Sequence, residues 1–215
     1  EARGAGSEGT VTLLWWNWPE QMQAEICEGY RLPFDRPPPS FKGDNYESAN
    51  CDKVYKEFSR MQNLDYMEGP VGEEDGSQVK VVSSISAVPK KNSDKLRVVI
   101  DMTASGLNDA MTAPRFVLPS VEDVADQSYN GCWYVVTDLK DGFYCQSLHK
   151  DHRRYLCARN PEDGKVYRYC RLPMGLAVSP FVFSRKVAVM VAEVVAQFPE
   201  FKVARYVVND TDPHM

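Results

Sequence analysis

Hydrophobic and polar positions alternate along this chain in patterns that predict helices and strands. The stretch 50–61 carries apolar residues at helical spacing, which predicts an amphipathic helix. The runs 79–91 and 95–102 are rich in β-branched residues and flank a polar turn, so they predict a β-hairpin with lysines at its tip. Ser120 followed by Asp123 is a capping-box signature, which predicts a short helix after residue 120.

The second half of the chain adds further elements. They are a strand buried on both faces at 133–138, a hairpin of 155–159 and 165–172, a buried helix at 180–198 and a returning strand at 201–210. Because strands and helices mix in this order, we expect an α+β fold, with helices in one layer against a sheet.

Residues 1–45 differ from the rest of the chain. They are rich in Gly and Pro around an apolar patch that contains Trp15, Trp16 and Trp18, and the patch has no regular period. We expect an extended arm that docks its tryptophans on another surface. That surface is either the chain's own core or a protein partner, and the sequence leaves both open.

Composition limits the class of protein. The chain has 215 residues, 43% of them hydrophobic and 26% charged, which excludes collagen-like, wholly disordered and heptad-repeat proteins. It contains no apolar run long enough to span a membrane, and its first ten residues lack a secretory signal pattern and look like the start of a fragment. We therefore expect a setting in the cytosol, the nucleus or an organellar matrix.

Charge and cysteine usage refine this expectation. The formal net charge of −5 argues against non-specific nucleic-acid binding, but residues 140–171 hold eight basic and four acidic side chains. This segment could follow a phosphate backbone or could simply coat a solvated face. The six cysteines show no metal-site or disulfide spacing, so we expect reduced and mostly buried thiols.

Two predicted strands end in a carboxylate, at Asp138 and Asp210. A carboxylate at the end of a buried strand is costly unless it is neutralised, and a divalent cation shared by both strands would neutralise it. Taken alone, the simpler interpretation is that each aspartate caps the following turn.

Five sequence blocks in a fixed order favour the metal-binding interpretation of the two aspartates, because together they resemble the reverse transcriptase family over about residues 41–210. The similarity is closest to the polymerases of LTR-type and DIRS-type retrotransposons. The blocks are 87–109, the helix start 118–124, 137–156, 167–183 and the degenerate 206–210. The resemblance implies right-hand polymerase fingers and a partial palm, with an N-terminal arm at 1–45, a fingers-like region at 46–132 and a partial palm at 133–215.

The resemblance also implies roles for individual residues. Asp138 corresponds to an aspartate that bridges two Mg²⁺ ions, with the Leu139 carbonyl as a further ligand, and Asp210 lies in the matching second motif. Lys90 and Arg97 match the family's triphosphate clamp, although a charged hairpin tip is more often just solvated.

Four further residues match the nucleotide side of the family's site. Asp141 and Gly142 would offer backbone N–H groups to a triphosphate, and Phe143 would block a ribose 2′-hydroxyl. Gly175 would let the backbone lie near the template base, and Ser179 and Pro180 would start the following helix as cap and first residue.

One position departs from the family pattern. Asn209 stands where the family has the first of two adjacent aspartates, and a neutral amide cannot supply the negative charge that offsets two Mg²⁺ ions. This loss should cost on the order of 10³-fold or more in rate. The family's returning strand, primer grip and thumb have no counterpart before Met215.

Three functions remain open at this stage. The first is a catalytically impaired reverse-transcriptase-like domain, kept as a structural or interaction component whose partners bind the tryptophan arm. The second is an active RNA-directed DNA polymerase fragment that uses Mg²⁺, a deoxynucleotide and an RNA or DNA template-primer. The third is a plain nucleic-acid-binding module.

Overall fold

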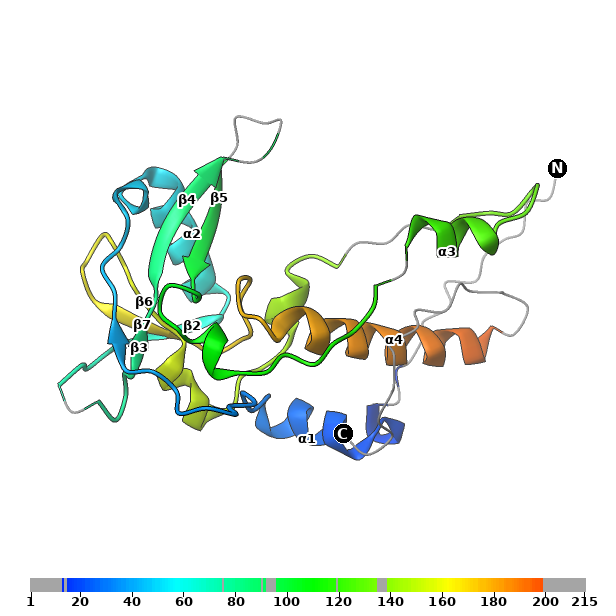
Figure 1. Ribbon diagram of the computed structural model, residues 1–215, viewed down its shortest axis with the longest axis horizontal. Coiled ribbons are helices and arrows are strands. Elements are labelled where there is room, and N and C mark those ends of the chain that lie inside the picture. The colour runs from blue at the N-terminus through cyan, green and yellow to red at the C-terminus, as the bar shows by residue number, and fades with distance from the viewer. Residues whose placement is uncertain are drawn as a thin grey trace.

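The computed structural model describes residues 13, 15–74, 76–89, 91, 96–118, 120–134 and 139–198. The helices are α1 (Glu20–Glu28), α2 (Asp52–Asn63), α3 (Val121–Asp126) and α4 (Ser179–Gln197), and five short 3₁₀ helices join them: η1 (Trp15–Asn17), η2 (Glu47–Ala49), η3 (Asn108–Ala110), η4 (Gly142–Cys145) and η5 (Lys150–Tyr155). The strands are β1 (Phe41–Lys42), β2 (Met67–Val71), β3 (Val81–Val82), β4 (Ser84–Pro89), β5 (Leu96–Asp101), β6 (Cys157–Arg159) and β7 (Val166–Tyr169). This mixture confirms the predicted α+β class (Figure 1).

The strands form two sheets. Five of them lie in the order β1-β3-β6-β7-β2, in which β3 runs parallel to β1 and β6, and β7 runs antiparallel to β6 and β2. The second sheet is the predicted hairpin of β4 and β5, which pairs in continuous register from Ser84 opposite Asp101 to Pro89 opposite Leu96. The turn between these strands includes Lys90 and residues 92–95, which lie outside the described part of the chain.

The second predicted hairpin and the predicted capping box are both confirmed. Strands β6 and β7 pair around a turn in which the Asn160 side chain accepts a hydrogen bond from the Glu162 backbone N–H at 3.0 Å. At the start of α3, the Ser120 hydroxyl accepts from the Asp123 backbone and the Asp123 carboxylate accepts from the Ser120 backbone. Local chemistry therefore determines both segments.

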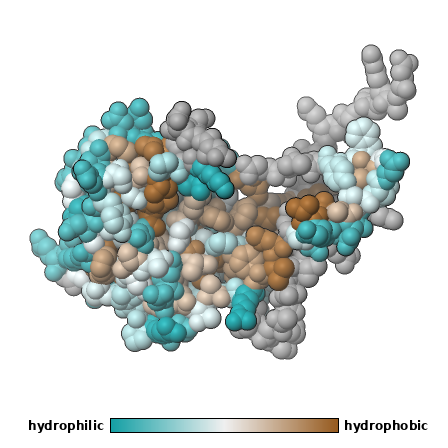
Figure 2. Space-filling view, turned by 45° about the horizontal axis from the view of Figure 1, so that its top comes forward, coloured by the Kyte–Doolittle hydropathy of each residue, from teal (hydrophilic) through white to brown (hydrophobic). Residues whose placement is uncertain are grey.

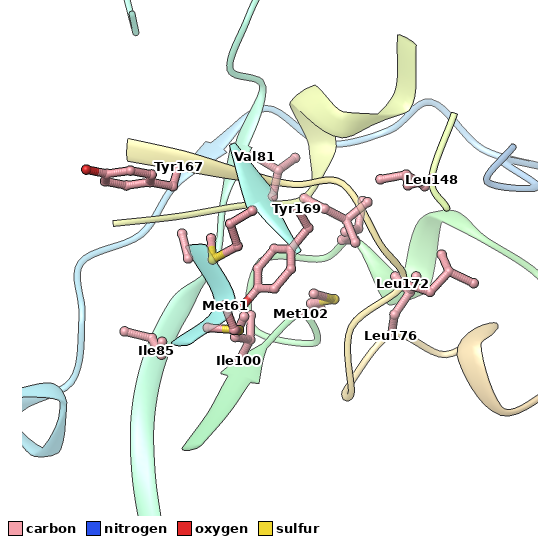
Figure 3. Packing of buried hydrophobic residues seen from close by; sticks show 14 of the residues in the cluster. Met61, Val81, Ile85, Ile100, Met102, Leu148, Tyr167, Tyr169, Leu172 and Leu176 are labelled. Carbon is pink, nitrogen blue, oxygen red and sulfur yellow. The ribbon is translucent and has the colours of Figure 1, made fainter. Parts of the chain in front are cut away.

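The core lies between α2 and the two sheets. The predicted apolar face of α2 is buried, because Val54, Phe58 and Met61 are each no more than 1% exposed. Figure 3 shows the Tyr169 ring lying among Met61, Met102 and Ile100. Complete burial raises the pKa of Tyr169 well above its ordinary value, so this phenol stays neutral and packs as part of the hydrophobic core.

The N-terminal arm is not wholly extended as predicted, because Glu20–Glu28 forms α1. Its sequence lacks an apolar stripe: Met22 is buried, but the other buried residue of the helix is Glu25. Glu25 pairs with Arg185 of α4 at 2.5 Å. An ion pair to a distant helix cannot be recognised from hydrophobic periodicity, which explains why the prediction missed α1.

Three other predictions require correction. Helix α4 has the predicted extent, but only Ser179 and Val182 are buried, and most of its other residues are half-buried. Trp133 and Tyr134 are 95% and 64% exposed and lie outside any strand, whereas residues 135–138 and the predicted strand at 201–210 are not described. Among the six free cysteines, only Cys157 is buried.

Apolar surface gathers around α3 and α4 (Figure 2). The side chains of Val117, Leu118, Val121 and Val124, in α3 and the segment before it, are exposed, as is that of Trp133. None of the helices within the described ranges has the length and apolarity needed to cross a bilayer.

Candidate functional site

The turn that follows residue 138 is held in place by helix α2. Asp141 has a left-handed backbone conformation with a φ of 55° and stands at the start of η4. Its carboxylate accepts two hydrogen bonds from the Arg60 guanidinium, at 2.7 and 3.3 Å. Arg60 also binds Glu57 at 2.7 Å, so two carboxylates orient one guanidinium. The hydrogen bond to Glu57 raises the pKa of Arg60. Partial burial lowers this pKa, and the hydrogen bond to Asp141 raises it further.

Gly142 lies directly against the first turns of α4. A Cβ atom at Gly142 would come within 2.6 Å of a ring carbon of Phe183. The Phe143 ring meets the Phe183 ring edge-on, with 5.5 Å between their centroids. The absence of a side chain at Gly142 leaves room for the Phe183 ring, which supports the Phe143 ring. The half-buried aromatic side chain of Phe143 therefore has a packed support.

Gly175 lies directly on strand β5. Its φ of 100° is in the region that favours glycine, and a Cβ atom there would lie 2.9 Å from the Ile100 carbonyl oxygen. The Asn108 side chain fixes the same loop from the other side. Its amide donates to the Gly175 carbonyl at 3.0 Å and accepts from the Ala177 backbone at 2.9 Å. The loop before α4 is therefore clamped between β5 and η3.

The start of α4 differs in detail from the prediction. The residue before the helix is Val178, and the Ser179 hydroxyl donates to the Pro173 carbonyl at 2.9 Å, so Ser179 does not act as the N-terminal cap. Pro180 does lie in the first turn, as predicted. The Ser179 hydrogen bond closes the loop that contains Gly175.

Arg97 lies on β5 opposite Val88, and its side chain is exposed. It is three residues before Ile100, so the strand places it roughly 10 Å from the point where Gly175 meets β5. Leu139 is 46% exposed at the start of the turn that leads into η4. The structure thus gathers η4, the Gly175 loop and β5 around the start of α4.

Four predicted site residues lie outside the described part of the chain: Lys90, Asp138, Asn209 and Asp210. Within the described ranges, no group of three or more His, Cys, Asp or Glu side chains could hold a metal ion. The predicted pairing of strand-end carboxylates stays a prediction.

Sequence analysis missed three residues that shape the site, namely Arg60, Asn108 and Phe183. Arg60 follows Glu57 at the spacing of a helical ion pair, which is the only local signal. Its contact with Asp141 joins segments 81 residues apart. The sequence pattern marked Phe183 only as one residue of an apolar helix, and it gave Asn108 no role beyond that of a turn residue.

Helix α1 lies below α4 in the view of Figure 1 and supports α4 and the segment that follows η4. Gln146, just after η4, donates to the Glu25 carbonyl at 3.0 Å and accepts a hydrogen bond from Lys186. Burial lowers the pKa of Lys186, and the negative charge of Glu25 partly offsets this effect. Trp18 donates from its indole to Glu193 of α4 at 2.7 Å. One tryptophan of the arm therefore docks on the chain's own fold.

Comparisons with known proteins agree with this architecture. Residues 88–207 match the family described as "Reverse transcriptase (RNA-dependent DNA polymerase)". The chain is 34% identical over 112 residues to the retrovirus-related Pol polyprotein from transposon 412 of Drosophila melanogaster. This match covers 50% of this chain and 9% of that protein. It is 33% identical over 79 residues to the Gag-Pol polyprotein of feline leukemia virus. That match covers 35% of this chain and 5% of the polyprotein.

The fold resembles a solved structure of a foamy viral protease-reverse transcriptase in complex with double-stranded DNA. The TM-score is 0.51 at 17% sequence identity, and the match covers 80% of this chain and 28% of that one. The chain spans less than a tenth of the length of the two polyproteins.

Proposed function

Because the chain belongs to the reverse transcriptase (RNA-dependent DNA polymerase) family, we propose that it forms the fingers (46–132) and part of the palm (133–215) of a retroelement polymerase whose catalysis is impaired. The LTR-type and DIRS-type retrotransposons are the proposed source. The observation that carries the substrate class is the contact of Gly142 and Phe143 with Phe183. It provides a packed aromatic wall after the turn that follows Asp138.

The nucleotide side of the site is proposed to be intact. A deoxynucleotide would lie with its sugar against Phe143 and its phosphates near the backbone of Asp141 and Gly142. The ion pair between Asp141 and Arg60 supports this, because it fixes the backbone that would face the phosphates. Arg97 and Lys90 on the hairpin would hold the triphosphate charge. Gly175 would lie close to the template base.

The metal side of the site is proposed to be defective. Asp138, Asp210 and the Leu139 carbonyl are oxygen donors of the kind that Mg²⁺ prefers, so they would hold the ion. When bound, Mg²⁺ neutralises phosphate charge and activates the primer hydroxyl. Asn209 offers a neutral oxygen in place of a carboxylate, which weakens the site for a doubly charged ion beside a triphosphate.

A structural role fits this combination of features. Trp15 and Trp16 are 38% and 56% exposed on η1. Their rings meet edge-on, with centroids 6.4 Å apart. Aromatic side chains of this kind are enriched in protein interfaces. We propose that they bind a protein partner while the fold is retained, and that the protein acts inside the cell.

The second candidate is an active RNA-directed DNA polymerase that uses an RNA or DNA template-primer. The packed support behind Phe143 favours it, since a scaffold has no need of a sugar gate. A primer-extension assay with Mg²⁺ separates the two candidates. Robust extension that is abolished by Asp138→Asn would establish the active polymerase. Extension near background, with the protein folded, supports the impaired one.

A further inference from the structure

A polar hollow of about 330 Å³ lies apart from the site described above. It is formed by η5, strand β7 and the loop that joins β2 to β3. These elements lie on the left of the molecule in Figure 1, whereas α4 extends to the right. Its lining residues are Ser77, Lys150, Asp151, Arg154 and Arg168.

The lining carries three cationic side chains and one carboxylate. The carboxylate, Asp151, is shared with groups outside the hollow, because it lies 3.7 Å from Arg31 and 3.6 Å from His149. The hollow therefore has an excess of positive charge. Its volume is large enough for a small ligand.

The two arginines have unused hydrogen-bonding capacity. The Nε atoms of Arg154 and Arg168 are both buried, and neither has a hydrogen-bond partner among the residues that the structure describes. The Arg154 guanidinium lies over the Tyr155 ring at 5.1 Å and forms no ion pair with any described residue. Buried N–H donors in folded proteins nearly always have an acceptor, and these two have none among the described residues.

The carboxylate that pairs with Arg168 is shared between two arginines. Glu68 already binds Arg168 at 2.6 Å and Arg153 at 2.7 Å. Burial of the Glu68 carboxylate opposes its ionisation, but the charges of Arg153 and Arg168 outweigh it and lower the pKa of Glu68. One carboxylate thus balances two guanidinium groups, whereas Arg154 and the exposed Lys150 form no ion pair with any described residue.

We propose that this hollow binds a phosphoryl dianion. Such a group offers several acceptor oxygens in three directions, which suits two guanidinium groups and an ammonium approaching from different elements. The phosphoryl group would come either from a nucleic-acid backbone or from free phosphate. The site uses none of the residues assigned to the deoxynucleotide and does not depend on polymerase activity.

Calorimetric titration of the whole chain with inorganic phosphate at low salt tests the proposal. We expect saturable binding that weakens by about tenfold in Lys150→Gln and in Arg154→Gln, since each change removes a charged donor. Arg154→Lys should lie between Arg154→Gln and the unaltered chain, because it keeps the charge but loses the guanidinium fork. The matched controls Lys53→Gln and Arg115→Gln change exposed cations elsewhere and should leave binding unchanged.

A second titration with a single-stranded oligonucleotide identifies the source of the phosphoryl group. If it is a nucleic-acid backbone, the two pocket variants weaken oligonucleotide binding as well, and phosphate competes. If it is free phosphate, only the phosphate titration responds. Absence of saturable phosphate binding, or equal binding by pocket and control variants, would overturn the proposal. Lys150 is exposed, so Lys150→Gln keeps the test valid if the Arg154 variants unfold.

Discussion

The Asp141 carboxylate lies 2.7 Å from the Arg60 guanidinium, and this contact joins helix α2 to the turn that carries Gly142 and Phe143. The two side chains are 20% and 33% exposed, so the pair is partly shielded from water. It fixes a residue with a left-handed backbone just before η4. The position of the proposed nucleotide wall therefore depends on a helix about 80 residues earlier in the sequence.

Breaking this pair should destabilise the fold and displace η4. We expect Arg60→Ala and Asp141→Ala each to lower the free energy of unfolding by about 1–3 kcal/mol, because each leaves a partly buried charge without its partner. In a double-mutant cycle followed by urea denaturation, the two losses should be less than additive. Lys53→Ala, on the same helix, serves as the control. Strict additivity would show that the pair is not coupled.

Gly142→Ala should introduce a clash with the Phe183 ring. The added Cβ would lie 2.6 Å from a ring carbon, so the Phe183 ring, α4 or η4 must shift. We expect a loss of about 1–3 kcal/mol in unfolding free energy. Phe183→Leu in the same chain should recover part of it, because a smaller side chain frees the space. Failure of this second substitution to help would argue against the close packing.

Gly175→Ala should be more damaging than Gly164→Ala. Both glycines have a positive φ, at 100° and 68°, but a Cβ at Gly175 would lie 2.9 Å from the Ile100 carbonyl, whereas Gly164 has nothing within 4 Å. Backbone strain alone costs about 1 kcal/mol or somewhat more. Thermal denaturation of both variants separates strain from steric contact. Equal losses would mean that the Gly175 loop can move away from β5.

Glu68 should make stability depend on pH. Its folded-state pKa lies below the ordinary value of 4.5, so the ionised carboxylate stabilises the fold above that pH. This contribution disappears as pH falls through the lower folded-state pKa. Urea denaturation should show Glu68→Gln less stable than the unaltered chain near pH 7 and the difference shrinking near pH 3. Glu74→Gln, in an exposed loop, is the control. A difference that is constant with pH would contradict the ion pairs.

Local patterns predicted much of the fold but little of what positions the site. The hairpin of β4 and β5, the face of α2 and the Ser120 cap follow from period, turn residues and hydrogen bonds within a few residues. Helix α1 was missed because its buried Glu25 is explained only by Arg185 on a distant helix. Periodicity carries no information about such partners.

The residues of the candidate site also fall into two groups: those that a local motif predicts and those that only a long-range contact explains. Gly142, Phe143 and Gly175 were predicted from their motifs, and the structure supplies a steric reason for each glycine, while their roles toward a nucleotide stay predictions. Arg60, Asn108 and Phe183 act through contacts between segments far apart in the chain, so no local motif marks them. The roles of Lys90, Asp138, Asn209 and Asp210 stay predictions.

The central claim is that a nucleotide wall is retained while the metal site is weakened at one position. Its most direct test is the single-turnover rate of deoxynucleotide addition to a template-primer with Mg²⁺, compared between the unaltered chain and Asn209→Asp. The account predicts a rate increase on the order of 10³-fold in the variant, abolished again by adding Asp138→Asn. Equal rates in the unaltered chain and Asn209→Asp, both lost with Asp138→Asn, would contradict it.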